Sequence, residues 1–217
     1  MSSQAVLRSL RQMRFDNVFN PYTDRCPVYD RINAPLIRGR CLGRVLRRAA
    51  ATRLDAIWVG RDLGHRGGRR TGLAFADDVN LPGHLARWGL RTQRATSGEP
   101  MAETTAAVIW DVLRQIESPI FLWNIFPLHP HRRGEPFSNR THNAQEGRAG
   151  EELLIRMIEW LAPRRVIAVG GDAFAALSRR SAGVEVVRVR HPSYGGRSEF
   201  LNSMRGLYGL EHPEAPG

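Results

Sequence analysis

The chain has 217 residues, with 32 Lys or Arg against 21 Asp or Glu, which gives a formal net charge of +11. This length suits one domain with a sizeable core, and the excess of positive charge favours a polyanionic partner, although a merely solvated basic surface would give the same composition. Every basic side chain is arginine, which excludes a lysine Schiff base, and two cysteines are too few for a four-cysteine metal site.

No apolar run is long enough to span a membrane, and the first residues lack the apolar core of a signal peptide. We therefore expect a cytoplasmic, monomeric protein with no membrane partner.

The amino-terminal region is expected to form two helices joined by a loop. Apolar residues recur at helical spacing from Gln4 to about Arg14, and prolines break the pattern over 16–30. A second helical pattern covers 31–52. Its expected apolar stripe is Leu36, Cys41, Val45, Leu46 and Ala49, and its expected solvated face is Arg38, Arg40, Arg44 and Arg48.

The first strand is predicted at 55–60, where a short apolar run stops at Gly60. The glycine-rich segment that follows, up to Phe75, contains a carboxylate and a histidine but has neither helical nor strand periodicity. Such a segment is typical of an active-site loop at the carboxyl end of a strand, because glycines allow a ligand to approach the backbone closely.

Helices are predicted next at 81–88 and 103–117, and the apolar run 120–123 predicts a second buried strand that ends at Asn124. The arginine- and histidine-rich stretch 129–148 is too long and irregular for an ordinary connection, so we expect it to be functional or mobile.

Helices and strands alternate in the last part of the chain. The predicted order is a helix at 151–161, a strand at 165–169, a helix at 172–180, a strand at 184–189 and a helix at 198–207. This alternation implies a parallel sheet covered on both faces by right-handed crossovers. We predict a three-layer α/β/α sandwich with a central four-stranded parallel sheet, in one domain made of amino-terminal helices (1–52), an α/β core (53–208) and a tail (209–217).

Three of the predicted strands are followed by a polar residue, namely Asp62, Asn124 and His191. Because the carboxyl ends of parallel strands lie along one edge of the sheet, a carboxylate, an amide and an imidazole can meet there.

These positions carry a resemblance to a known family. Gly60-Arg61-Asp62-Leu63-Gly64-His65 is similar to the first motif of family 1 uracil-DNA glycosylases, Gly-Gln-Asp-Pro-Tyr-His, and His191-Pro192-Ser193 resembles their second motif. Asn124 resembles the asparagine that reads the uracil edge, and Phe75 lies at the spacing of the base-stacking aromatic. The agreement covers roughly residues 55–208 and suggests an atypical, bacterial-looking member of the superfamily.

The resemblance implies a base-excision repair enzyme that hydrolyses the N-glycosidic bond of uracil flipped out of DNA, with no cofactor and no metal. Asp62 would orient the attacking water and His191 would donate to the uracil oxygen as negative charge develops there. The base-binding residues would be Gly60, Arg61, Phe75 and Asn124. The residues expected to contact DNA are His65, Arg69, Arg70, Arg132, Arg133, Ser193, Tyr194 and Arg197.

Two departures from the family pattern concern specificity and DNA distortion. Gly64 stands where family 1 has a tyrosine that excludes the thymine methyl group, so this exclusion would have to come from Leu63 or His65. Gly195 occupies the position of the leucine wedge, and its nearest substitutes are Tyr194 and Arg197.

Other functions remain open on the sequence. The same fold could act on hypoxanthine, xanthine or mismatched thymine, or could bind damaged DNA without turnover. A nucleotide- or phosphate-binding α/β protein ranks last, because the chain has no Walker lysine and no convincing Rossmann fingerprint.

Overall fold

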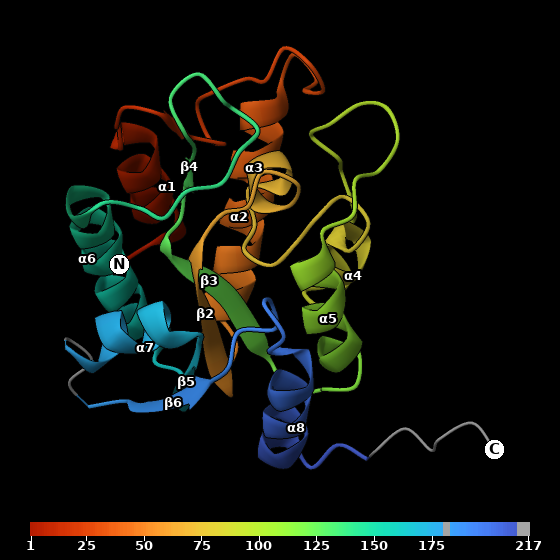
Figure 1. Cartoon of the computed structure of the whole chain (residues 1–217), viewed down its shortest axis with the longest axis vertical. Helices are drawn as coiled ribbons and strands as arrows, with labels where there is room; N and C mark the ends of the chain where they lie inside the picture. The colour runs from red at the N-terminus through yellow and green to blue at the C-terminus, as the bar shows by residue number, and fades with distance from the viewer. Residues whose placement is uncertain (180–182, 212–217) are drawn as a thin grey trace.

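A parallel sheet in the order β3-β2-β5-β6 forms the middle layer of the molecule (Figure 1). The computed structural model describes residues 1–179 and 183–211. Within these residues the strands of the sheet are β2 (Ala56–Asp62), β3 (Ile120–Phe126), β5 (Arg165–Val169) and β6 (Glu185–Val189). Each neighbouring pair is parallel, which confirms the predicted four-stranded sheet and three-layer sandwich.

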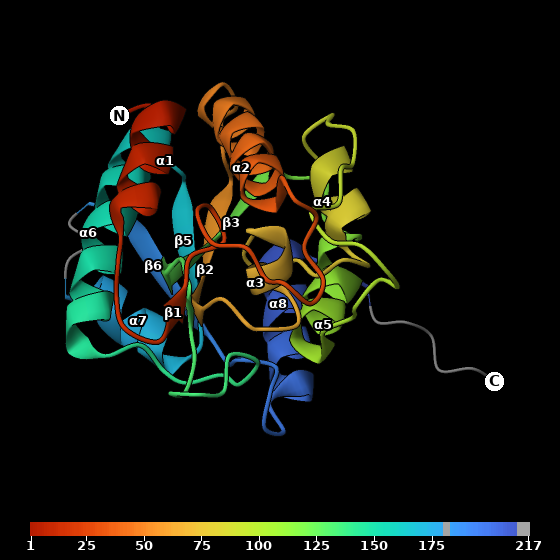
Figure 2. The ribbon, with the colours of Figure 1, turned by 90° about the horizontal axis from the view of Figure 1, so that it is seen from above.

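Helices cover both faces of this sheet (Figure 2). They are α1 (Ser3–Gln12), α2 (Ala34–Ala50), α3 (Gly68–Thr71), α4 (Leu81–Ala86), α5 (Thr104–Leu113), α6 (Ala144–Leu161), α7 (Gly171–Ser178) and α8 (Arg197–Tyr208). The short strands β1 (Val18–Phe19) and β4 (His129–Pro130) form a separate antiparallel pair. None of the helices in the described ranges is long and apolar enough to cross a membrane.

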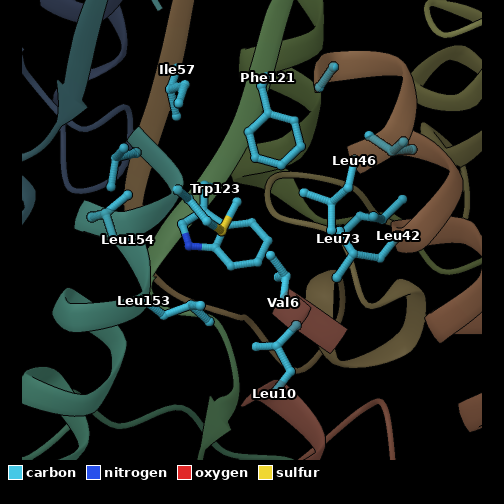
Figure 3. Packing of buried hydrophobic residues seen from close by; sticks show 14 of the residues in the cluster. Val6, Leu10, Leu42, Leu46, Ile57, Leu73, Phe121, Trp123, Leu153 and Leu154 are labelled. Carbon is cyan, nitrogen blue, oxygen red and sulfur yellow. The ribbon is translucent and has the colours of Figure 1, made fainter. Parts of the chain in front are cut away.

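Alternating side chains of β2 divide the core into two parts. Ile57 and Val59 pack with α1, α2 and α6, whereas Ala56 and Trp58 pack with α5 and α8. Figure 3 shows the first part, where Phe121 and Trp123 of β3 stack beside aliphatic side chains of α1, α2 and α6. Burial on both faces explains why the two central apolar runs lack the alternation of a half-exposed strand.

Several predicted boundaries are wrong at the functional edge of the sheet. The strands β2 and β3 continue to Asp62 and Phe126, so Asn124 lies inside a strand and not at its end. The glycine-rich loop contains the short helix α3. The expected carboxyl end of the helix at 172–180 lies outside the described residues.

The stretch 129–148 is more ordered than its composition indicates. It begins with β4 and ends in the first turn of α6, which starts at Ala144 and not at 151. A capping box begins this helix: the Asn143 side chain accepts from the Glu146 N–H at 3.0 Å, and the Glu146 carboxylate accepts from the Asn143 N–H at 2.8 Å.

The predicted solvated face of α2 is wrong at Arg38. This residue is fully buried, it forms an ion pair with Asp30, and its Nε donates to the Arg70 carbonyl at 2.8 Å. Leu36, predicted to be buried, is 43% exposed. The reason is a tertiary contact that the helical pattern does not reveal: the loop before α2 folds over this face, and its Asp30 supplies the carboxylate that pairs with Arg38.

Two buried histidines make stability depend on pH. Burial lowers the pKa of His84 to about 4 and that of His129 to about 3, whereas an unfolded histidine titrates near 6.5. Between these values the unfolded chain binds more protons than the folded one, so stability is fully present above pH 6.5 and is lost as the pH falls toward the folded pKa values. We expect each histidine to contribute up to about 1.4 kcal/mol of lost stability per pH unit in this range.

Urea unfolding of the wild type and of His84→Phe from pH 7.5 to pH 4.5 measures this effect. The variant should show a shallower decline of the free energy of unfolding, and identical slopes would contradict the assignment.

Candidate functional site

Asp62, at the end of β2, is held by two side chains. His142 Nδ1 lies 2.5 Å from Asp62 Oδ1, and Arg61 Nε donates to Asp62 Oδ2 at 2.9 Å. The Asp62 side chain is only 7% exposed. Each carboxylate oxygen has a second lone pair, so the group can still accept a hydrogen bond from a water molecule or ligand.

Asn124 faces the same region from β3, where it pairs in register with Gly60 of β2. A Cβ atom on Gly60 would lie 2.5 Å from Phe75 Cζ and 2.6 Å from Asn124 Oδ1. The absence of a side chain at Gly60 therefore lets the Phe75 ring and the Asn124 amide meet. Asn124 is 3% exposed, yet no residue in the described ranges hydrogen-bonds to its side-chain amide. Its amide is thus available to a ligand, which argues against a purely structural role.

Phe75 is fixed by its backbone. Its φ of 53° lies in the left-handed region, which is unusual for an aromatic residue, and its carbonyl accepts from Trp110 Nε1 of α5 at 2.8 Å. This anchoring directs the ring to Gly60.

His191 follows β6 and is half-buried against Gly170. Burial, together with the charges of Arg61 and Arg190, lowers the pKa of His191, so the imidazole is neutral at pH 7. The Ser193 N–H donates to His191 Nδ1 at 3.2 Å, which assigns the proton of the neutral ring to Nε2. His191 is therefore a neutral N–H donor.

These four side chains line one cavity of about 330 Å³. The structure thus brings together the predicted residues Asp62, Phe75, Asn124 and His191. Arg61, Ser193 and Tyr194 also line the cavity. In the part of the chain that the structure describes, no three His, Cys, Asp or Glu side chains cluster closely enough to hold a metal ion.

Arg69 and Arg70 are not where a DNA-contacting role requires them. Both are buried, at 3% and 6% exposure. Arg69 Nε donates to the Tyr29 hydroxyl at 2.8 Å, and Arg70 Nε donates to Asp78 at 2.7 Å. Their predicted contact with DNA is wrong, because Tyr29 and Asp78 already occupy the two guanidinium groups inside the protein.

The other predicted DNA contacts remain at the surface. Arg132, Arg133, Tyr194 and Arg197 are exposed, and His65 and Ser193 are half-buried. The ion pairs of Arg132 with Glu135 and of Arg197 with Asp111 are long, at 3.5 Å, and solvent-exposed, so both arginines are free to rearrange.

Two further residues belong to the site although no sequence motif indicates them: His142, which contacts Asp62, and Glu103, which lines the cavity. His142 lies within the irregular stretch before α6, and Glu103 precedes α5, where burial and the nearby Asp77 raise its pKa to about 7. Neither lies in a motif. For His142 the unusual length of the 129–148 stretch is a signal, although it indicates no particular residue, and for Glu103 the sequence offers no such signal.

Comparison with known proteins now gives the family. A family model described as the uracil DNA glycosylase superfamily matches residues 49–206. The crystal structure of wild-type SMUG2 from Pedobacter heparinus is similar, with a TM-score of 0.57 and 13% identity over 96% of this chain and 98% of that chain. A mutant of UNG from Nitratifractor salsuginis has a TM-score of 0.44 and 17% identity over 79% and 78% of the two chains. No curated protein matches the sequence.

The close approach at Gly60 can be tested by stability. We expect Gly60→Ala to lower the free energy of unfolding by roughly 1–3 kcal/mol, because the new methyl group overpacks against Phe75 and Asn124. Gly206→Ala in α8 is the matched control, since nothing lies within 4 Å of its added Cβ, and it should be neutral or stabilising by up to about 1 kcal/mol. Equal effects in urea unfolding would contradict the crowding at Gly60.

Proposed function

Because this chain belongs to the uracil DNA glycosylase superfamily and is thus a DNA-repair glycosylase, we propose that it hydrolyses the N-glycosidic bond of uracil flipped out of DNA and leaves an abasic site. The observation that carries the proposal is the single cavity that joins Asp62, Phe75, Asn124 and His191. The reaction is monofunctional in this proposal, since the chain has no lysine side chain to form a Schiff base with the sugar.

Departure of the base leaves positive charge on the sugar, and Asp62 provides the negative charge that stabilises it. The free lone pairs of Asp62 orient the attacking water and accept its proton. His142 acts through Asp62 as a positioning residue: its ring packs against Phe126, with ring centroids 6.1 Å apart, and its Nδ1 holds one carboxylate oxygen in place.

The departing base takes up negative charge, and His191 Nε2–H donates to the uracil O2 where this charge develops. A neutral donor suits this task, because it stabilises the anion without first ion-pairing with Asp62. Removing one such donor typically costs about 10²–10³-fold in rate.

Asn124 reads the base edge in this proposal. Its amide offers one donor and one acceptor, which match the O4 and N3–H of uracil and mismatch the reversed pattern of cytosine. Phe75 stacks on the flipped base, and the crowding around Gly60 keeps ring and amide at a fixed separation.

Tyr194 is the best candidate for the side chain that fills the hole left by the flipped base. It is 99% exposed, it lines the cavity, and its φ of 52° lies in the left-handed region, which is unusual for a residue other than glycine. Exposed arginines, including Arg132 and Arg133, would contact the flanking phosphates.

Single-turnover base release from a uracil-containing oligonucleotide tests the reaction. We expect Asp62→Asn to lower the rate by about 10²–10⁴-fold with little change in DNA affinity, since Asp62 acts on water and charge and not on the phosphates. Equal losses in rate and affinity would make Asp62 structural.

His142 is tested by a matched pair. We expect His142→Asn to keep much of the activity, because the asparagine Nδ2 can replace the imidazole Nδ1 as donor to Asp62, whereas His142→Phe should lose it. The same rate in both variants would exclude a positioning role through this hydrogen bond.

For Tyr194 we expect Tyr194→Ala to slow base release from duplex DNA at least tenfold more than from single strands, because only a duplex leaves a hole to fill. Tyr194→Phe is the control and should behave like the wild type. A uniform effect on both substrates would contradict a wedge.

A panel of oligonucleotides, each with one altered base, separates the alternatives. Release of hypoxanthine, xanthine or thymine in preference to uracil would keep the chemistry and change the substrate. Binding without any release would favour a catalytically silent damaged-DNA-binding module.

A further inference from the structure

The Glu103 side chain forms the wall of the cavity above two glycines. A Cβ atom added to Gly64 would collide with Glu103 Oε1, and one added to Gly67 would collide with Oε2. Glu103 thus fills the space that a side chain at position 64 would otherwise take. It comes from the turn before α5, a different part of the chain from the motif loop itself.

The backbone of Glu103 is anchored while its carboxyl group is free. The Glu103 N–H donates to Asp77 Oδ2 at 2.7 Å, and Asp77 Oδ1 is occupied by the backbone and side-chain N–H groups of Asn80. Within residues 1–179 and 183–211, no group donates a hydrogen bond to the Glu103 carboxyl oxygens. A half-buried carboxyl group that lines a cavity without a partner is available to a ligand.

The electrostatic surroundings make this group both donor and acceptor. Burial and the neighbouring Asp77 raise the pKa of Glu103 to about 7, and the charge of Arg66 opposes them. Both protonation states are therefore populated near neutral pH, and the protonated form can donate to a carbonyl oxygen.

The base pose proposed above leaves one edge for Glu103. Asn124 takes N3–H and O4, and His191 takes O2, so the C5 edge of a pyrimidine remains. Glu103 lies against Gly64 and lines the same cavity as Asn124. In the proposed pose its carboxyl group lies beside C5 and donates to the second lone pair of O4.

We propose that Glu103 is a specificity-determining residue, whose carboxyl group accepts uracil and rejects thymine at the C5 edge. This rests on the proposed function. A methyl group at C5 would displace water from the carboxyl group and give it no hydrogen bond in return, which is costly for a buried polar group. A site that hydrogen-bonds its substrate discriminates more strongly than an apolar pocket of the same shape.

Single-turnover rates of base release from U·G and T·G duplexes measure this specificity in the wild type, Glu103→Gln, Glu103→Leu and Glu103→Ala. Glutamine keeps the size, a donor and an acceptor, so we expect the uracil-to-thymine rate ratio to stay within about threefold of the wild type. Leucine removes the polar group and alanine opens the wall, and both should lower the ratio at least tenfold. Glu99→Ala, an exposed site nearby, is the control and should not change it.

A wild-type ratio in both Glu103→Leu and Glu103→Ala would overturn the proposal. Glu103→Asp is a conservative change that retracts the carboxyl group by one methylene, and it should lower the uracil-to-thymine rate ratio at least threefold. An unchanged ratio in this variant would overturn the proposal even if the leucine and alanine variants fail to fold. Absence of uracil release by the wild type would instead refute the proposed function itself.

Discussion

The parallel pairing of β2 with β3 is the constraint on which the site depends. Its register sets Gly60, which has no side chain, opposite Asn124, so the backbone leaves room beside the Asn124 amide. Side chains two residues apart on a strand point to the same face, which puts Asp62 on the face of the sheet to which Gly60 belongs, beside the cavity that Asp62 and Asn124 line. A shift of register by one residue would send these groups to opposite faces, so the strand pairing that builds the core also builds the pocket.

The segment after β2 is held in place by arginine and tyrosine side chains. The Tyr22 hydroxyl donates to the Gly72 carbonyl at 2.6 Å, Arg38 bonds the Arg70 carbonyl, and Arg70 bonds Asp78. These contacts connect the amino-terminal region to the loop that carries Phe75. A left-handed backbone at Phe75 persists only where its surroundings determine it, and this network provides such surroundings.

The sequence predicted the parts of the site that follow from strand geometry. The short apolar runs, each followed by a polar residue, were sufficient to predict that Asp62, Asn124 and His191 lie at one edge of the sheet. His142 and Glu103 could not be predicted in this way, because each comes from a distant segment: His142 lies 80 residues from its partner Asp62, and Glu103 lines the cavity from the start of α5. The error at Arg69 and Arg70 has the same cause: burial of an arginine depends on partners such as Tyr29, which local sequence does not reveal.

Arg61 connects the two halves of the proposed chemistry, which require opposite protonation states. It donates to Asp62 and to Asp172, each at 2.9 Å, and its positive charge helps to lower the pKa of His191. One guanidinium group thus pairs with the carboxylate that must stay charged and disfavours charge on the imidazole that must stay neutral. Its side chain is 44% exposed, so solvent weakens each pairing taken alone. Its contribution therefore lies in its position between Asp62 and His191. The planar guanidinium group can also hold Asp62 and Asp172 in one fixed arrangement, which a lysine ammonium could not do, so arginine suits this position for a physical reason.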